Sequence, residues 1–237
     1  MRISIPRESG EGEWRVAATP SAIRALVQAN HEVWVEQSAG SASGFGDDEY
    51  IRAGASIAPT AEEAFGRADW VWKVLAPSPH EITLLHAGQT VAALLHASPP
   101  LPTIVQGFAL ERIEIAGEHP VLAAMSEIAG RLGVEAASLA LSKTRGGLGI
   151  LLGGVPGVAP ARVVVIGAGV AGRAAAETAV AVGADVEVLD VEVGRLRSFR
   201  VVGARTLHAT PHAIERSLVG ADVGIAAVRD GSPKAPR

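Results

Sequence analysis

The sequence predicts an α/β protein in two parts, an N-terminal α/β domain followed by an incomplete Rossmann-type parallel sheet. Strand-like and helix-like segments alternate almost from the first residue, which is typical of parallel sheets covered by helices. A Gly/Pro-rich stretch at residues 146–157 interrupts this alternation. Beyond it, a glycine motif directly follows a short apolar run, as in nucleotide-binding βα units.

The N-terminal part shows helix and strand signals in turn. Thr19 and Pro20 predict the N-cap and first residue of a helix over 20–27. Thr60 opens a second helix through a capping box with Glu63, and a short helix is expected at 48–53. Alternation of polar and apolar residues, or β-branched and aromatic runs, predict strands at 3–6, 32–36, 69–75, 90–95 and 113–116.

A long run of helix-forming residues follows at 126–143. We therefore expect a substrate and catalytic α/β domain over residues 1–125. A connecting helix is expected over 126–145 and a truncated Rossmann domain over 146–237.

Composition limits the classes of function. The chain has 237 residues, 48% of them hydrophobic and 19% charged, which is a globular composition. Its net charge of -4 argues against nucleic-acid binding. Because it contains no cysteine, disulfides, thiolate catalysis and Cys-ligated zinc are excluded, and no metal site is predicted. No signal peptide or membrane span is evident, so the expected location is the cytoplasm.

The glycine motif carries the clearest chemistry. The strand predicted at 162–166 leads into Gly167-x-Gly169-x-x-Gly172 and then an Ala-rich helix. In this pattern the first glycine permits a tight turn, the second admits a pyrophosphate, and the third allows the helix to pack on the strand. Asp190 ends the next predicted strand, where a carboxylate can bind a ribose hydroxyl and favour NAD over NADP. The alternative is an Ala/Gly-rich packing helix that binds nothing.

Several motifs resemble the alanine dehydrogenase family, which includes the nicotinamide nucleotide transhydrogenase α-subunit. They are Glu13-Trp14-Arg15-Val16-Ala17-Ala18-Thr19-Pro20, Trp72-Lys73-Val74, Leu95-His96, Met125-Ser126-Glu127-Ile128-Ala129-Gly130-Arg131, Leu151-Leu152-Gly153-Gly154-Val155-Pro156-Gly157-Val158 and Lys234-Ala235-Pro236. The resemblance covers the whole chain. It implies an NAD-dependent oxidoreductase that interconverts L-alanine, or a similar amino acid, and its 2-oxo acid.

The resemblance also implies catalytic roles. Arg15 would bind the substrate carboxylate, Lys73 would hold that carboxylate or polarise the carbonyl, and His96 would be the general acid/base. These residue types suit the reaction, because an arginine side chain can bind a carboxylate in a bidentate way and a histidine side chain titrates near neutral pH. Judged without the resemblance, Arg15 is more simply a surface charge, and His96 is equally well a satisfied core histidine.

For the cofactor, the resemblance implies a phosphate contact from Ser126. It places Val170, Arg195 and Val228 in the lining of the NAD site.

Relatives in this family continue past the equivalent of Lys234-Ala235-Pro236, with further Rossmann strands and an aspartate that acts beside the histidine. The sequence therefore resembles a C-terminally truncated member. Two alternatives to the dehydrogenase stay open: a non-redox amino-acid-tailoring enzyme, and a catalytically degenerate NAD(H)-binding or regulatory protein. An unpaired edge strand at 222–228 predicts a homo-oligomer that covers it.

Overall fold

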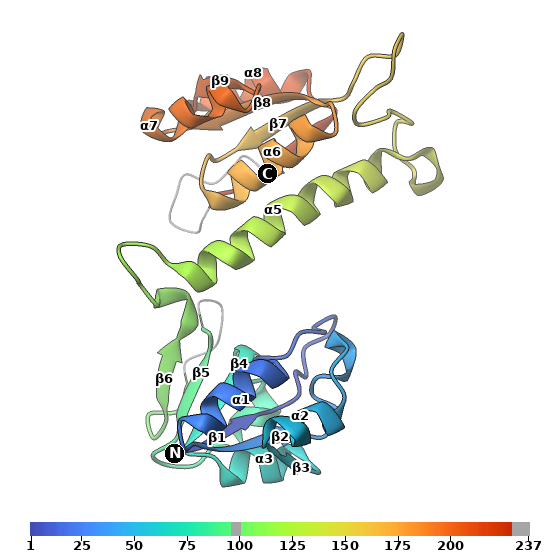
Figure 1. Cartoon of the computed structure of the whole chain (residues 1–237). Coiled ribbons are helices and arrows are strands. Elements are labelled where there is room, and N and C mark those ends of the chain that lie inside the picture. The colour runs from blue at the N-terminus through green and yellow to red at the C-terminus, as the bar shows by residue number, and fades with distance from the viewer. Residues whose placement is uncertain (96–100, 229–237) are drawn as a thin grey trace. The chain divides into compact units, whose positions relative to one another are not determined.

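The computed structural model describes residues 1–95 and 101–228 and divides into two compact units, Met1–His119 and Pro120–Arg237 (Figure 1). Both are α/β units built on parallel sheets, as the sequence predicted. The division precedes by six residues the boundary expected from the sequence at 125 and 126. Within the described residues, no helix combines the length and apolar character needed to cross a membrane.

The first unit contains a six-stranded parallel sheet in the order β3-β2-β1-β4-β5-β6. Its strands are β1 (Arg2–Ile5), β2 (Glu32–Glu36), β3 (Ser56–Ala58), β4 (Trp70–Leu75), β5 (Thr90–Leu94) and β6 (Gln106–Ala109). The chain moves outward from β1 to β3, returns to β4 on the other side of β1, and continues to β6. This is the strand order of a doubly wound fold, and its topological switch point lies between β1 and β4.

In the described part of this unit, four α-helices connect the strands: α1 (Pro20–Gln28), α2 (Asp47–Ala53), α3 (Ala61–Arg67) and α4 (Pro79–Ile82). Helix α1 begins as predicted, because the Thr19 side chain accepts a hydrogen bond from the Ala22 N–H and Pro20 occupies the first turn. The buried Ile23 side chain of α1 joins a core made mainly with β1 and β2, while β4 and β5 contribute Val71 and Val91 to a second cluster.

The strand predicted at 113–116 is wrong. The strand that pairs with β5 is β6, which ends at Ala109 and is followed by a 3-10 turn at Leu110–Arg112. Ile115 is 63% exposed and forms only an isolated bridge with Glu118. Positive φ angles at Ala116 and Gly117 make this segment a tight turn. The alternation of Ile113 and Ile115 with polar or small residues therefore predicted a strand, although this segment has no buried face.

The second unit contains a four-stranded parallel sheet in the order β10-β7-β8-β9. Its strands are β7 (Arg162–Ile166), β8 (Asp185–Asp190), β9 (Arg205–His208) and β10 (Val223–Ala226), and its α-helices are α5 (Pro120–Leu141), α6 (Val170–Ala181), α7 (Val193–Leu196) and α8 (Pro211–Val219). The switch point lies between β7 and β10, and β10 is an edge strand of the described sheet. The sheet is thus a Rossmann-type half, as predicted.

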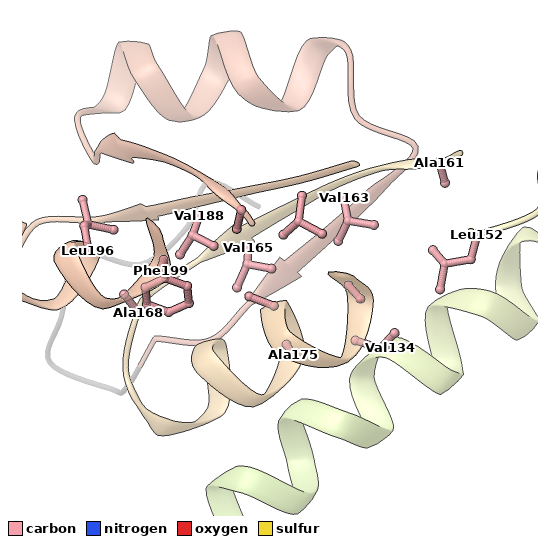
Figure 2. Close-up of a cluster of buried hydrophobic side chains, with 14 of the residues drawn as sticks. Val134, Leu152, Ala161, Val163, Val165, Ala168, Ala175, Val188, Leu196 and Phe199 are labelled. Atoms are coloured by element: carbon pink, nitrogen blue, oxygen red, sulfur yellow. The ribbon is translucent and has the colours of Figure 1, made fainter. Parts of the chain in front are cut away.

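Helix α5 starts at Pro120, six residues before the helical stretch predicted from Ser126. It packs on α6 (Figure 1), where Gly130 allows the helices to approach closely: a Cβ at Gly130 would lie 2.2 Å from the Ala171 carbonyl oxygen. Figure 2 shows the core beside this contact, in which Val134 of α5 and buried side chains of α6, β7 and β8 gather. Helix α5 therefore packs as part of the second unit.

Candidate functional site

The glycine loop lies at the switch point of the second sheet, directly after β7. Gly167 has a φ of +106°, and a Cβ there would lie 2.5 Å from the Ala227 carbonyl oxygen. A Cβ at Gly172 would lie 1.7 Å from the Gly167 carbonyl oxygen, so only glycine lets α6 begin this close to β7. Gly169, the N-cap of α6, is different: a Cβ there would meet nothing within 4 Å. Gly167 and Gly172 thus shape the loop, and Gly169 faces open space.

Asp190 closes the same loop from the end of β8. Its side chain is 6% exposed. Its Oδ2 accepts a hydrogen bond from the Ala168 N–H at 2.6 Å, and its Oδ1 accepts one from the Glu192 N–H at 2.7 Å. The carboxylate therefore connects the β7–α6 turn to the residues after β8. This places it at the carboxyl ends of both strands, where open α/β sheets bind ligands.

The other residues predicted for the cofactor surround this loop. Val170 is the first residue of α6 and is 47% exposed. Val228 follows β10, and its Cγ1 would lie 3.2 Å from a Cβ at Gly167. Arg195 pairs with Glu192 at 2.9 Å and lies 3.9 Å from the Asp190 carboxylate.

Ser126 lies on α5, one turn before Gly130. Residues four apart share a helix face, and Gly130 contacts the first turn of α6. Ser126 and the other seven residues predicted for the cofactor all belong to the second unit.

A buried charge cluster lies at the switch point of the first sheet. Lys73 of β4 has a side chain that is 1% exposed, and its Nζ lies 2.7 Å from Glu81 Oε1 and 3.4 Å from Glu8 Oε2. Glu8 follows β1, while Glu81 belongs to α4. Burying an ammonium is costly unless it is paired. The two carboxylates explain how Lys73 can occupy the core.

The two carboxyl groups differ in their proton affinity. Burial raises the pKa of Glu8, against the opposing effects of the Lys73 ammonium and the Val74 N–H. Burial also acts to raise the pKa of Glu81, but the Lys73 ammonium and the Ser78 N–H and hydroxyl outweigh it, so this pKa is lowered. Glu81 is therefore the stable counter-ion of Lys73.

Arg15 lies in the loop between β1 and α1, and 45% of its side chain is exposed. Its guanidinium donates two hydrogen bonds to the Glu13 carboxylate, from Nε at 2.8 Å and from Nη2 at 2.6 Å. The hydrogen bond from Arg15 lowers the pKa of Glu13. The negative charge of Glu8 also acts on Arg15. Arg15 and Lys73 thus share an acidic neighbour in the first unit.

His96 lies outside the described residues. The chain immediately before it is held by Glu111, whose carboxylate oxygens accept hydrogen bonds from the Leu95 N–H at 3.1 and 3.2 Å. Glu111 is itself only 9% exposed.

Sequence reasoning missed the acidic residues Glu8, Glu81 and Glu111. Only Glu81 had a local signal: Ser78-x-x-Glu81 is a capping box, in which the Glu81 carboxylate accepts from the Ser78 N–H and the Glu81 N–H donates to Ser78 Oγ. Glu8 contacts Val74 across 66 positions of the chain, which no spacing rule detects. No group of three or more possible metal ligands occurs among the described residues.

Two doubly wound sheets, one with a buried lysine cluster and one with a glycine loop closed by an aspartate, define a two-unit α/β protein with a Rossmann-type second unit. Two family profiles cover nearly the whole chain: "Alanine dehydrogenase/PNT, N-terminal domain" matches residues 4–129, and the corresponding C-terminal domain matches residues 133–237. The chain belongs to this family.

Individual relatives support the same family membership. Alanine dehydrogenase from Methanococcus maripaludis is 39% identical over 100% of this chain and 66% of its own length. A solved structure of L-alanine dehydrogenase superposes with a TM-score of 0.89 at 38% identity, covering 100% of this chain and 68% of the other. A transhydrogenase structure from Sinorhizobium meliloti gives a TM-score of 0.79 at 29% identity, covering 99% and 72%. The chain thus spans about two thirds of the length of these relatives.

Proposed function

We propose that this protein is an NAD-dependent oxidoreductase that interconverts an amino acid, L-alanine or a similar one, and its 2-oxo acid. The observation that carries the proposal is the loop at Gly167–Gly172, closed by Asp190 through its hydrogen bond with the Ala168 N–H. The family relationship supports the same activity, because relatives that are 39% and 40% identical to this chain are named alanine dehydrogenase.

The residues of the second unit fit a dinucleotide. Open space at Gly169 adjoins the first turn of α6, which contains no acidic residue. Backbone N–H groups and the positive end of the helix dipole favour phosphates at such a position. In the proposal Gly167, Gly169 and Gly172 form the phosphate loop and Asp190 accepts from the ribose hydroxyls. The remaining contacts come from Ser126, Val170, Arg195 and Val228.

Asp190 determines which dinucleotide we expect. A buried carboxylate at the ribose position repels a 2′-phosphate, so NAD is favoured over NADP. Arg195 does not reverse this preference in the proposal, because its guanidinium already pairs with Glu192.

The first unit supplies the substrate groups. Arg15 is a cation in the loop that follows β1, Lys73 is a cation in the C-terminal half of β4, and His96 follows β5 in the sequence. In the proposal Arg15 binds the substrate carboxylate, Lys73 holds the carboxylate or polarises the carbonyl, and His96 transfers protons. We assign substrate binding to residues 1–125, connection to residues 126–145 and cofactor binding to residues 146–237.

In the amination direction, a 2-oxo acid, ammonium, NADH and a proton give the amino acid, NAD⁺ and water. The carbonyl carbon gains a bond to nitrogen and a bond to hydride, and its oxygen leaves as water. The bound dinucleotide supplies that hydride. The protein's own residues orient the carboxylate, stabilise negative charge at the carbonyl oxygen and move the protons.

The test is NADH consumption with a panel of 2-oxo acids plus ammonium, in the wild type and in His96→Ala. We expect turnover on one small oxo acid, and its loss in the variant. A folded protein that binds NADH but turns over none of the panel would overturn the dehydrogenase assignment and favour an NAD(H)-binding role.

We also propose a cytoplasmic homo-oligomer in which a second copy covers the edge strand β10.

A further inference from the structure

The environment of Lys73 goes beyond simple charge neutralisation. One ammonium is held by two buried carboxylates, with side chains of Glu8 and Glu81 only 3% and 6% exposed. A single carboxylate would suffice as a counter-ion. A second one brings the cluster to a net negative charge when both are ionised, and buried ionic groups rarely add stability over apolar ones. Stability alone therefore does not explain this arrangement.

Glu81 is itself rigidly placed. Its Oε2 accepts from the Ser78 N–H at 2.7 Å while its Oε1 accepts from Lys73 Nζ at 2.7 Å, so its two oxygens are committed to different partners. The capping box at the start of α4 fixes the backbone from which it projects. The position of the Lys73 ammonium is therefore coupled to a backbone feature of α4.

Glu8 fixes the lysine from the other strand of the switch point. Its Oε1 accepts a hydrogen bond at 2.7 Å from the N–H of Val74, the residue that follows Lys73 in β4. Its Oε2 lies 3.4 Å from Lys73 Nζ. An ammonium has three N–H donors. Contacts with two carboxylates use at most two of them, so one N–H can be directed at a ligand.

We propose that Glu81 and Glu8 are positioning residues that hold the Lys73 ammonium in one orientation at the switch point of the first sheet, with one N–H presented to the carbonyl or carboxylate oxygen of the substrate. This inference rests on the proposed function for the identity of the substrate, a 2-oxo acid. The positioning itself is a property of the folded protein and can be measured without turnover.

The sequence makes a direct measurement possible, because it contains only three lysines, Lys73, Lys143 and Lys234. The full chain is labelled with [¹⁵N]lysine, and side-chain ammonium signals are recorded. Ammonium protons that are buried and hydrogen-bonded exchange slowly with water, so Lys73 gives a sharp signal, which is assigned with Lys73→Met. Lys143, which is exposed, exchanges rapidly and is the internal reference.

Three variants define the outcome. Glu81→Gln removes the closer partner, and we expect the Lys73 signal to broaden or disappear. Glu8→Gln has the same effect to a smaller extent. The matched control is Glu36→Gln, a buried carboxyl that accepts from the Arg7 N–H and senses Lys73 only through its charge. This control keeps the signal. A sharp, unshifted Lys73 signal in both Glu81→Gln and Glu8→Gln would overturn the proposal.

Kinetics then separates positioning from a structural role. In Glu81→Gln we expect KM for the oxo acid to rise at least tenfold while the Kd for NADH stays within twofold of the wild type, and Glu81→Asp to recover part of the loss. Equal KM in variant and wild type would contradict the proposal. If the wild type shows no turnover but the Lys73 signal depends on Glu81, the proposed function fails and the positioning stands.

Discussion

Replacing Gly169 with alanine is expected to weaken NADH binding without unfolding the second unit. A Cβ at this position meets nothing within 4 Å, and the residue has a φ of −71°, which alanine adopts freely. The cost to the free protein is that of a poorer N-cap, about 0.5–1 kcal/mol. In the complex, the added methyl group occupies the space through which a pyrophosphate approaches the helix. We expect affinity to fall at least about tenfold, or about 1.4 kcal/mol.

Gly172→Ala provides the opposite case. Its Cβ would lie 1.7 Å from the Gly167 carbonyl oxygen, whereas real Cβ atoms essentially never approach closer than 3.0 Å. The start of α6 must therefore move away from β7 by more than an ångström. Overpacking of this kind costs about 1–3 kcal/mol, and we expect the upper end because the obstacle is backbone. The resulting loss in Tm is roughly 6–12 °C for a chain of this size.

The assay combines urea denaturation with a fluorescence titration of NADH. Gly66→Ala is the matched control, because a Cβ there also meets nothing within 4 Å and the residue lies in α3 of the first unit. Gly169→Ala should lose affinity with a stability loss of at most about 1 kcal/mol, Gly172→Ala should lose both affinity and stability, and Gly66→Ala neither. Wild-type NADH affinity in a folded Gly169→Ala would refute the assignment of this loop to the pyrophosphate.

A lost hydrogen bond at Asp190, the burial of Tyr50 and the edge strand β10 each have a measurable consequence. Asp190→Ala leaves the buried Ala168 N–H without its acceptor, so unfolding by urea should require about 1–3 kcal/mol less, and the preference for NADH over NADPH should relax; unchanged coenzyme preference would contradict the ribose assignment. Burial raises the pKa of Tyr50 to about 12 from 10.0. The folded state therefore retains the phenol proton, and stability present below pH 10 is lost as pH rises toward 12, by up to about 1.4 kcal/mol per pH unit; a steeper fall in wild type than in Tyr50→Phe checks this. Finally, light scattering at high concentration should detect a homo-oligomer, and a clean monomer would refute the covered edge at β10.

The elements around the glycine loop could be predicted because their signals are local. In strand β7, Arg162 is followed by four consecutive β-branched residues, and the predicted bounds of the strand are those observed. Asp190 was found from its position at the end of the next strand, and its carboxylate does close the loop. A strand or helix can be predicted from sequence when the hydrophobic pattern that indicates it lies within the same few neighbouring residues that form it.

Edge elements were harder to predict. Strand β9, Arg205–His208, has no buried residue in its burial pattern, so it shows no hydrophobic alternation. Strand β6 contains Gly107 and is largely exposed, while the more apolar Ile113–Ala116 segment forms a turn. Edge strands of this kind are determined by backbone pairing with a neighbour, which composition does not record.

The charge cluster in the first unit shows a different limit. Lys73 could be recognised as unusual, since a lysine in an apolar strand needs a partner. Its partners could not be identified, because Glu8 reaches it from the loop after β1 and Glu81 from helix α4. Topology brings these residues together, and a parallel sheet with a switch point between β1 and β4 places their strand ends side by side.

The most direct test of the central claim is hydride transfer itself. The protein is incubated with pyruvate, ammonium and NADH carrying deuterium at both C4 positions, and the alanine formed is analysed by mass spectrometry. If the protein is an NAD-dependent amino-acid dehydrogenase, the alanine carries one deuterium at Cα, and Lys73→Met forms at least about a hundredfold less of it, a loss of about 2.7 kcal/mol in transition-state stabilisation. Absence of deuterated alanine, or of the corresponding product from any 2-oxo acid tried, in a folded protein that binds NADH would contradict the account.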